Sequence, residues 1–413
     1  MFGTEELKKR EWFLIVIYFF FNTVFLPHGL LYTTLLTPLF MYSLYQRNIY
    51  KYIYWYPLAL LPFFIQHLTN GIELYYYVKS TVLMFTVVVF CVFVYHWAKD
   101  FQAWDKVMRR LVYWNAVFLV FAIIAYQTPQ YAHKWWWIRG ISSGIEGVSR
   151  LKLLTYEASY YSLLLVPVFS YFIVSSVMSD WWKKNIIPVL ILMVLLVLSF
   201  SLGVIGGLII ALSIVLTVLL YNKIGLKKFT LLGVGVIALL IGAIWLVTEL
   251  YPHSMLVTRL NNVLSGKDTS FNGRTSDSFF LADVLLGMKN KFWGIGFGQI
   301  KVLGLELWRS FYMHPYTFEE VAIPNAAAET FAIFGYLGLI LRILVQLTLF
   351  FTTKVYKNAF RLSLFLFIFI YQFTGSYIFS IAEYMIWILA FVPNFKDFDF
   401  INIKKKNENT LPV

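Results

Sequence analysis

The residues of this sequence that could perform chemistry are charged side chains inside or beside long apolar stretches. Glu157 lies in SRLKLLTYEASYYSLLL, and Arg150 precedes it by seven positions. Ionisable groups in such places are costly and mark functional candidates. If the helix predicted over 151–176 extends back to Arg150, the two side chains share one face about 10 Å apart. A carboxylate whose pKa is raised by burial can accept a proton from a substrate hydroxyl. An ion pair with Lys152 or a neighbouring helix is the alternative role for Glu157.

Arg274 is the second candidate, and its chemistry is anion binding. It comes just before residues 276–290, whose apolar spacing predicts a helix. The free amides of that helix's first turn and a guanidinium together suit a pyrophosphate. The planar guanidinium binds phosphate in a bidentate way and stays charged when partly dehydrated. Arg150 and Arg139 are further phosphate candidates, and solvated loop arginines are the alternative.

Four further residues, together with Arg139, complete the candidate site as substrate-binding groups. His314 lies in the loop sequence YMHPY and could carry a proton, although a loop histidine is more often solvated. Asn325 and Glu329 are four positions apart and would share a helix face at the entry to an apolar stretch. They either bind hydroxyl groups or cap and anchor that helix. The substrate-binding candidates are Arg139, Tyr160, His314, Asn325 and Glu329.

The elements that must hold these residues are membrane helices. Hydrophobic residues make up 60% of the 413 residues and charged residues 13%, against about 45–50% and about 25% in soluble domains. The sequence therefore predicts an all-α polytopic membrane protein with about 12 spans. The predicted spans are about 12–27, 30–46, 53–68, 76–96, 111–127, 151–176, 186–200, 203–221, 229–250, 327–351, 359–374 and 378–393.

The distribution of Lys and Arg predicts the topology. Threading these spans with the N-terminus inside puts most basic residues on the cytoplasmic side, with the tail that holds Lys404, Lys405 and Lys406. The net charge of +13 thus reflects membrane topology, and no nucleic-acid partner is expected. We expect the first apolar stretch to remain as an uncleaved helix, because no small-residue cleavage site follows it.

Two predicted outer segments are longer than turns. The first, within 128–150, contains Trp135, Trp136 and Trp137, which suit the membrane interface. The second runs from about 251 to 326, far beyond the usual connection. Inside it, we expect one short amphipathic helix with Phe280, Val284 and Met288 on one face. The predicted organisation is 1–250 with nine spans, the outer loop 251–326, 327–393 with three spans, and the cytoplasmic tail 394–413.

Several chemistries are disfavoured. Cys91 is the single cysteine and lies in an apolar run, so it predicts a buried thiol and no disulfide. The cytoplasmic loops are too short for a nucleotide-binding domain, and no GxxxxGK[ST], HExxH, CxxC or GxSxG occurs. The glycines of WGIGFG lack a preceding strand and indicate a tight loop. We expect no cofactor and no metal dependence.

Arg342 and Glu383 lie within spans, where ion pairing or snorkelling is the expected role.

Two regions resemble a known family. GRTSDSFFLADVLLGMKNKFWGIGFG followed by PNAAAETFAIFGYLGLI resembles the polysaccharide polymerase and O-antigen ligase superfamily of bacterial inner membranes. SRLKLLTYEASYYSLLLVPVF is similar to the E-x-S segment of Wzy-type repeat-unit polymerases. The resemblance implies a membrane glycosyltransferase of GT-C-like architecture that uses lipid-linked donors, such as undecaprenyl pyrophosphate, on the periplasmic face.

The resemblance also implies roles for individual residues. Arg274 would contact the donor pyrophosphate, and Glu157 and Arg150 would form the pair at the outer end of the sixth span. The ligase branch has a His next to the Asn before the re-entering span, whereas Pro324 stands before Asn325 here. This difference favours a polymerase over a ligase, unless His314 reaches in from the loop.

The expected partners are a lipid-linked oligosaccharide donor and acceptor, the bilayer, and a chain-length regulator and flippase. Two alternatives remain. One is an O-antigen ligase or protein O-oligosaccharyltransferase, which differs only in its acceptor. The other is a lipid-linked oligosaccharide flippase, for which internal repeats and modest loops are typical. The hypothesis that Glu157 and Arg274 form one catalytic site makes a geometric prediction. The outer loop should fold over the end of the sixth span and bring Arg274 close to Glu157.

Overall fold

A computed structural model describes most of the chain. The described residues are 11–13, 15–18, 32–138, 149–178, 182–221, 249–250, 255–312 and 321–402. Regular structure in these ranges is almost entirely helical. The sheet found there is one antiparallel pair, β1 (Trp136–Ile138) and β2 (Ser149–Leu151).

Five helices are long and apolar enough to cross a membrane. They are α4 (Leu74–Lys99), α5 (Trp104–Tyr126), α7 (Ala158–Met178), the helix Leu202–Tyr221 and α14 (Ala326–Thr352). This set is compatible with a multi-pass membrane protein. The other helices are α2 (Tyr32–Gln46), α3 (Trp55–Thr69), α6 (Pro129–Trp135), α8 (Trp182–Ser199), α10 (Met255–Leu264), α11 (Thr269–Arg274), α12 (Ser276–Gly287), α13 (Ile300–Tyr312), α15 (Ala359–Tyr371) and α16 (Ile381–Phe391), with the 3-10 helices η1 (Tyr50–Tyr54), η2 (Val355–Lys357) and η3 (Lys396–Phe398).

Several predicted spans coincide with these helices, and a total of twelve stays a prediction. The ranges 30–46, 53–68, 186–200, 359–374 and 378–393 overlap α2, α3, α8, α15 and α16. Most of the ranges 12–27 and 229–250 lies outside the described residues.

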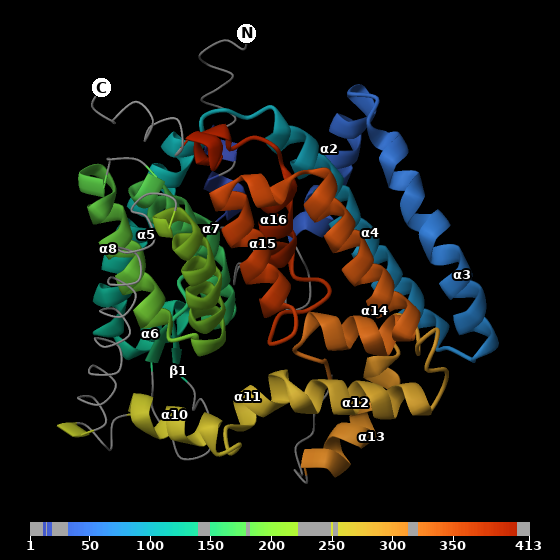
Figure 1. Ribbon diagram of the computed structural model, residues 1–413. Coiled ribbons are helices and arrows are strands. Elements are labelled where there is room, and N and C mark those ends of the chain that lie inside the picture. The colour runs from blue at the N-terminus through green and yellow to red at the C-terminus, as the bar shows by residue number, and fades with distance from the viewer. Residues whose placement is uncertain are drawn as a thin grey trace.

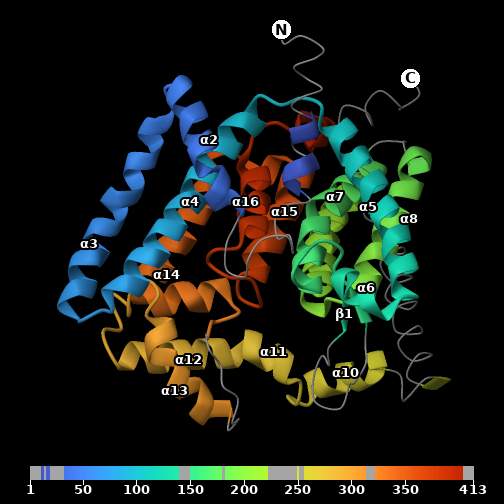
Figure 2. The same cartoon turned by 180° about the vertical axis from the view of Figure 1, so that it is seen from behind.

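The helices form a bundle with a separate layer across one end. Helices α10, α11 and α12 follow one another across the lower end of the bundle, from below α6 to below α14, and α13 lies beneath α12 (Figure 1). The view from behind shows the same layer (Figure 2). The connection between α4 and α5 lies at the opposite end in both views. The predicted outer loop 251–326 thus forms four described helices where the sequence predicted one, and it covers the end of the bundle at which α7 begins.

Two apolar cores hold these parts together. The larger core lies within the bundle, where Phe90, Leu165 and Phe367 are fully buried. The smaller core joins α12 to α14 and includes Leu285 and Ile333. Burial of apolar surface contributes about 25 cal/mol of stability per Å2. Such contacts therefore hold the layer of α10–α13 on the bundle.

The outward face of α12 is the one that the sequence pattern singled out. Phe280 and Met288 are exposed, while Leu281, Leu285 and Leu286 on the other side are buried. The sequence predicted a helix here, and α12 confirms it. The buried face was missed because α12 is apolar on both sides.

Glu157 is not inside a helix, which corrects the prediction of a helix over 151–176. Helix α7 begins at Ala158, and Arg150 lies in β2, paired with Trp137. Between them, Leu153 has a φ of 44° and the carbonyl of Trp135 accepts hydrogen bonds from the amides of Lys152 and Leu153. The strand pairing and this turn take the place of a helical turn before Ala158, so Arg150 and Glu157 do not share a helix face.

Helix α14 is bent at Gly335, which has a φ of 66° and a ψ of −164°. Hydrogen bonds with the loop after α12 satisfy backbone groups at this bend. The Gly296 N–H donates to the Ile333 carbonyl, and the Tyr336 N–H donates to the Lys291 carbonyl. Gly294 has a φ of 88°, and a Cβ there would lie 2.2 Å from the Ile333 carbonyl oxygen. The predicted tight loop at WGIGFG is therefore observed, and it binds the two halves of α14.

Candidate functional site

The candidate site is built around an ion pair between Glu157 and Arg274. The Nη2 of Arg274 lies 3.1 Å from the Oε1 of Glu157, across 117 positions of sequence. The side chains are 29% and 23% exposed, so the pair lies at the edge of the packed interior. The predicted proximity of Arg274 to Glu157 is observed.

Local hydrogen bonds place Glu157 at the first turn of α7. Its carbonyl accepts the Tyr161 amide at 3.2 Å and the Thr155 hydroxyl at 2.8 Å. A carboxylate at a helix N-terminus is favoured by the helix dipole. Helix α7 is itself deeply buried and is tied to α8 by the hydroxyls of Ser162 and Ser199, 2.7 Å apart. Glu157 therefore stands on a rigid support.

Arg274 is held by Asn325. The Nδ2 of Asn325 donates to the Arg274 carbonyl at 2.8 Å and to the Phe373 carbonyl at 2.7 Å. Its Oδ1 accepts the Ala328 amide and caps α14. Of the two roles that the sequence left open for Asn325, capping and anchoring is therefore the one observed. Asn325 positions Arg274, because it fixes that residue's backbone to α14 and to the segment after α15.

Arg150 faces the same site from β2. Its Nε donates to the Ser199 carbonyl at 3.1 Å, and the residue is 8% exposed. Burial lowers the pKa of Arg150 to about 10; Glu157 opposes this shift, and the charges of Arg274 and Arg259 add to it. That pKa is still far above neutrality, so Arg150 carries its charge at neutral pH. For Arg274, burial works against the charge, but Glu157 together with Tyr371 and Tyr377 outweighs it, and the pKa is raised.

Two tyrosines lie beside the ion pair. The rings of Tyr160 and Tyr377 are 6.3 Å apart. Burial raises the pKa of Tyr377 to about 12, and the nearby charge of Glu157 adds to the shift. Its phenol is thus neutral and able to donate a hydrogen bond. Sequence reasoning selected Tyr160 and missed Tyr377, because GSYIFS carries no signal beyond an ordinary turn.

A second pair that sequence reasoning missed is Arg259 with Asp268. The Nε of Arg259 lies 3.2 Å from the Oδ2 of Asp268, and the Oδ1 of Asp268 accepts the Phe271 amide at the start of α11. The sequence signal for it was available, since an Asp directly before TSFNGR is a typical helix cap. The pair fixes the corner between α10 and α11, and so the approach of Arg274.

Glu329 belongs to a separate, deeper group. Its Oε2 accepts the Ile378 amide at 2.7 Å. About two turns beyond the bend of α14, Arg342 donates to Glu383 at 2.6 Å, to Gln372 at 2.8 Å and to Thr330 at 3.1 Å. The expected structural pairing of Arg342 and Glu383 is observed, and they are each other's partner. Arg139 and His314 lie outside the described residues.

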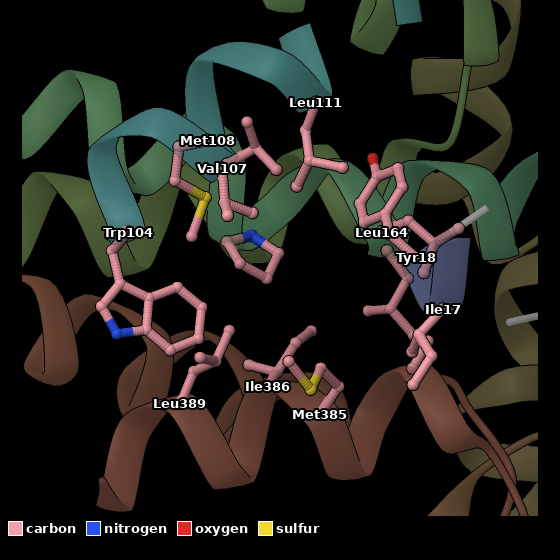
Figure 3. A pocket seen from close by; sticks show the side chains of 14 residues that line it. Ile17, Tyr18, Trp104, Val107, Met108, Leu111, Leu164, Met385, Ile386 and Leu389 are labelled. Carbon is pink, nitrogen blue, oxygen red and sulfur yellow. The ribbon is translucent and has the colours of Figure 1, made fainter. Parts of the chain in front are cut away.

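The bundle also contains an apolar cavity away from this site. Trp104, Leu111, Leu164 and Met385 are among its lining residues, which come from α5, α7, α16 and the segment around Tyr18 (Figure 3). The charged cluster of the site, which is Arg150, Glu157, Arg259, Asp268 and Arg274, contributes no residue to this lining. Across the described ranges, no group of three His, Cys, Asp or Glu side chains is arranged to hold a metal ion.

The site thus joins a half-buried carboxylate to guanidinium groups from β2, α10 and α11, in a helical protein with several apolar helices of membrane length. Comparison with known protein families finds no family that matches this sequence. Comparison with curated proteins also finds no significant match.

Proposed function

We propose that this protein is a membrane glycosyltransferase that polymerises polyprenyl-pyrophosphate-linked oligosaccharide repeat units into a surface polysaccharide, such as an O-antigen, capsule or exopolysaccharide. The observation that carries the proposal is the contact of Glu157 with Arg274, with Arg150 beside it. These groups come from the two regions that resemble the Wzy-type polymerases. A general base and a cationic anion site in one place is what this transfer needs.

The donor is a growing glycan on polyprenyl pyrophosphate. Its diphosphate needs cationic groups near the membrane surface, and Arg274 and Arg150 supply them at the end of the bundle covered by α10–α13. Its lipid needs access between helices, which an apolar bundle offers. The acceptor is the non-reducing end of a newly delivered lipid-linked repeat unit.

The proposed step is a displacement at the anomeric carbon of the donor. The acceptor hydroxyl oxygen forms the new bond to this carbon, and the bond to the pyrophosphate oxygen breaks, so that its electron pair leaves with the polyprenyl pyrophosphate. The hydroxyl proton passes to the carboxylate of Glu157. Arg274 and Arg150 stabilise the charge on the leaving group, which needs no protonation.

The ion pair suggests how donor binding prepares the base. In the absence of substrate, Arg274 neutralises Glu157 at 3.1 Å. A diphosphate that binds Arg274 competes with this carboxylate. The released Glu157 is then free to accept a hydrogen bond from the acceptor hydroxyl. Donor binding before acceptor binding follows from this exchange.

The proposed setting is the bacterial inner membrane, with both termini cytoplasmic and the α10–α13 layer on the periplasmic side. A flippase that delivers repeat units and a chain-length regulator are the proposed partners. The proposed reaction uses no metal and no cofactor, because the arginines provide the positive charge.

An assay with lipid-linked repeat units tests the proposal. Wild-type protein should yield long glycan chains, whereas Glu157→Gln and Arg274→Ala should yield none. Glu306→Gln and Arg309→Gln are matched controls, because both residues are exposed on α13, and both variants should remain active. Full activity in Glu157→Gln and in Arg274→Ala would refute the site. Transfer to a lipid A or protein acceptor in place of a repeat unit would identify a ligase.

A further inference from the structure

Arg259 is a buried arginine whose hydrogen-bond donors are only partly satisfied by Asp268. Its side chain is 10% exposed, and its ion-pair partner Asp268 is fully buried. The Nε donates to Asp268, but the buried Nη1 has no hydrogen-bond partner among the described residues. An unsatisfied buried donor on a charged group is costly, so such a group calls for an acceptor.

The position of Arg259 makes a phosphate the fitting acceptor. Arg259 and Arg150 meet at the end of α8: the Arg259 guanidinium lies over the Phe200 ring at 5.9 Å, and Arg150 donates to the Ser199 carbonyl. Arg259 is close enough for its charge to lower the pKa of Arg150. Arg274 acts on Arg150 in the same way, so the three guanidinium groups surround one region.

Charge is unbalanced in this region. Among the described residues here, three arginines share two carboxylates, Glu157 and Asp268. Each carboxylate already has one arginine at hydrogen-bonding distance, whereas the bond that Arg150 makes within the described ranges goes to a carbonyl. Placing like charges together is unfavourable unless an anion joins them.

We propose that Arg259 is a third phosphate-binding arginine of this site and gives it a preference for a diphosphate over a monophosphate. This inference rests on the proposed function, since it concerns the same donor. A diphosphate presents non-bridging oxygens on two phosphorus atoms, and a monophosphate on one. Guanidinium groups from β2, α10 and α11 can engage two phosphates, whereas one phosphate cannot satisfy all three.

A substitution at Asp268 distinguishes phosphate binding by Arg259 from a purely structural role of Arg259. If Arg259 only completes the α10–α11 corner, breaking the ion pair from either side should weaken the site equally. If Arg259 binds phosphate, Asp268→Asn removes a competing negative charge and keeps an oxygen that can cap α11. The two roles therefore predict opposite effects for Asp268→Asn.

The experiment measures binding of a prenyl diphosphate and of the prenyl monophosphate of equal chain length to the purified full-length protein in nanodiscs. We expect Arg259→Gln to weaken diphosphate binding about tenfold or more and to reduce the preference for diphosphate. Asp268→Asn should bind the diphosphate as tightly as wild type or more tightly. Arg309→Gln, the exposed control, should not change either affinity.

Equal weakening by Arg259→Gln and Asp268→Asn would overturn the inference, as would an unchanged preference in Arg259→Gln. If Arg259→Gln does not fold, Arg259→Lys replaces it: it keeps the charge but loses the planar fork, and several-fold weaker diphosphate binding is expected. Weakening by Arg274→Gln but not by Arg259→Gln refutes this inference alone. A wild-type protein that binds neither probe refutes the proposed function as well.

Discussion

At the scale of single residues, Asn325 is the side chain on which the geometry of the site depends most. It caps α14 and donates to the carbonyls of Arg274 and Phe373. Asn325→Ala should cost about 2 kcal/mol of stability, because it removes a helix cap and two donors. It should also lower glycan transfer strongly, since the backbone of Arg274 loses its anchor. Thermal unfolding and the transfer assay measure the two effects.

Asn358 provides a control of the same type. It caps α15 and donates to the Phe395 carbonyl and to Asp399, outside the charged cluster. Asn358→Ala should cost about as much stability as Asn325→Ala, yet leave transfer per folded molecule unchanged. Equal losses of transfer in both variants would show that Asn325 acts only through stability.

Some residues of the candidate site could be selected from the sequence alone. Glu157 stands out because charges are rare beside apolar stretches, and Arg274 because it directly precedes a predicted helix; both signals survive without knowledge of the fold. Arg259 does not stand out, because it lies in a polar segment where an arginine is ordinary. Its importance comes from burial and from Asp268, both of which arise only when α10 and α11 pack on the bundle.

At the scale of elements, the loop 291–298 stabilises the bend of α14. A Cβ at Gly294 would approach the Ile333 carbonyl to 2.2 Å, and the backbone there has a positive φ. Gly294→Ala should therefore lower both the thermal stability and the activity, because the added Cβ would push the loop away from the bend of α14. Gly287 has open space around its Cα, so Gly287→Ala should be neutral or stabilising by up to about 1 kcal/mol. Equal melting temperatures for the two variants would contradict the proposed role of the loop.

The ion pair of Arg342 with Glu383 joins α14 to α16. Glu383 is 1% exposed, so Arg342→Leu should destabilise the protein by about 3–5 kcal/mol by leaving a buried charge without its partner. The double variant Arg342→Leu with Glu383→Leu should recover much of this loss. Denaturant unfolding of the two variants measures the difference. A double variant that is less stable than Arg342→Leu would mean that the pair contributes net stability.

Sequence patterns predicted which elements exist better than where they begin or bend. Apolar length was enough for α4 and α14, because burial in a bilayer or core demands it. The start of α7 was misplaced because apolar length does not reveal the pairing of β2 with β1 or the turn at Leu153, which keep the residues before Ala158 out of the helix. The bend at Gly335 was missed because it depends on the backbone of a segment about 40 residues earlier, at Lys291 and Phe292.

At the scale of the whole molecule, the α10–α13 layer and the α4–α5 connection lie at opposite ends of the bundle (Figures 1 and 2). The distribution of basic residues predicts that the layer is periplasmic. In a Cys91→Ala background, cysteine introduced at Ser265, which is exposed, should react with a membrane-impermeant maleimide in spheroplasts. Cysteine introduced at Gln102, between α4 and α5, should react only after lysis. The reverse pattern would invert the topology.

The central claim is that the Glu157 and Arg274 site transfers glycan from a polyprenyl pyrophosphate, and the released lipid tests it most directly. Purified protein in liposomes should release one polyprenyl pyrophosphate for each glycosidic bond formed from lipid-linked repeat units. Arg274→Gln should abolish this release, while Arg309→Gln should not alter it. Glycan chains that grow without release of polyprenyl pyrophosphate, or release that continues in Arg274→Gln at the wild-type rate, would contradict the account.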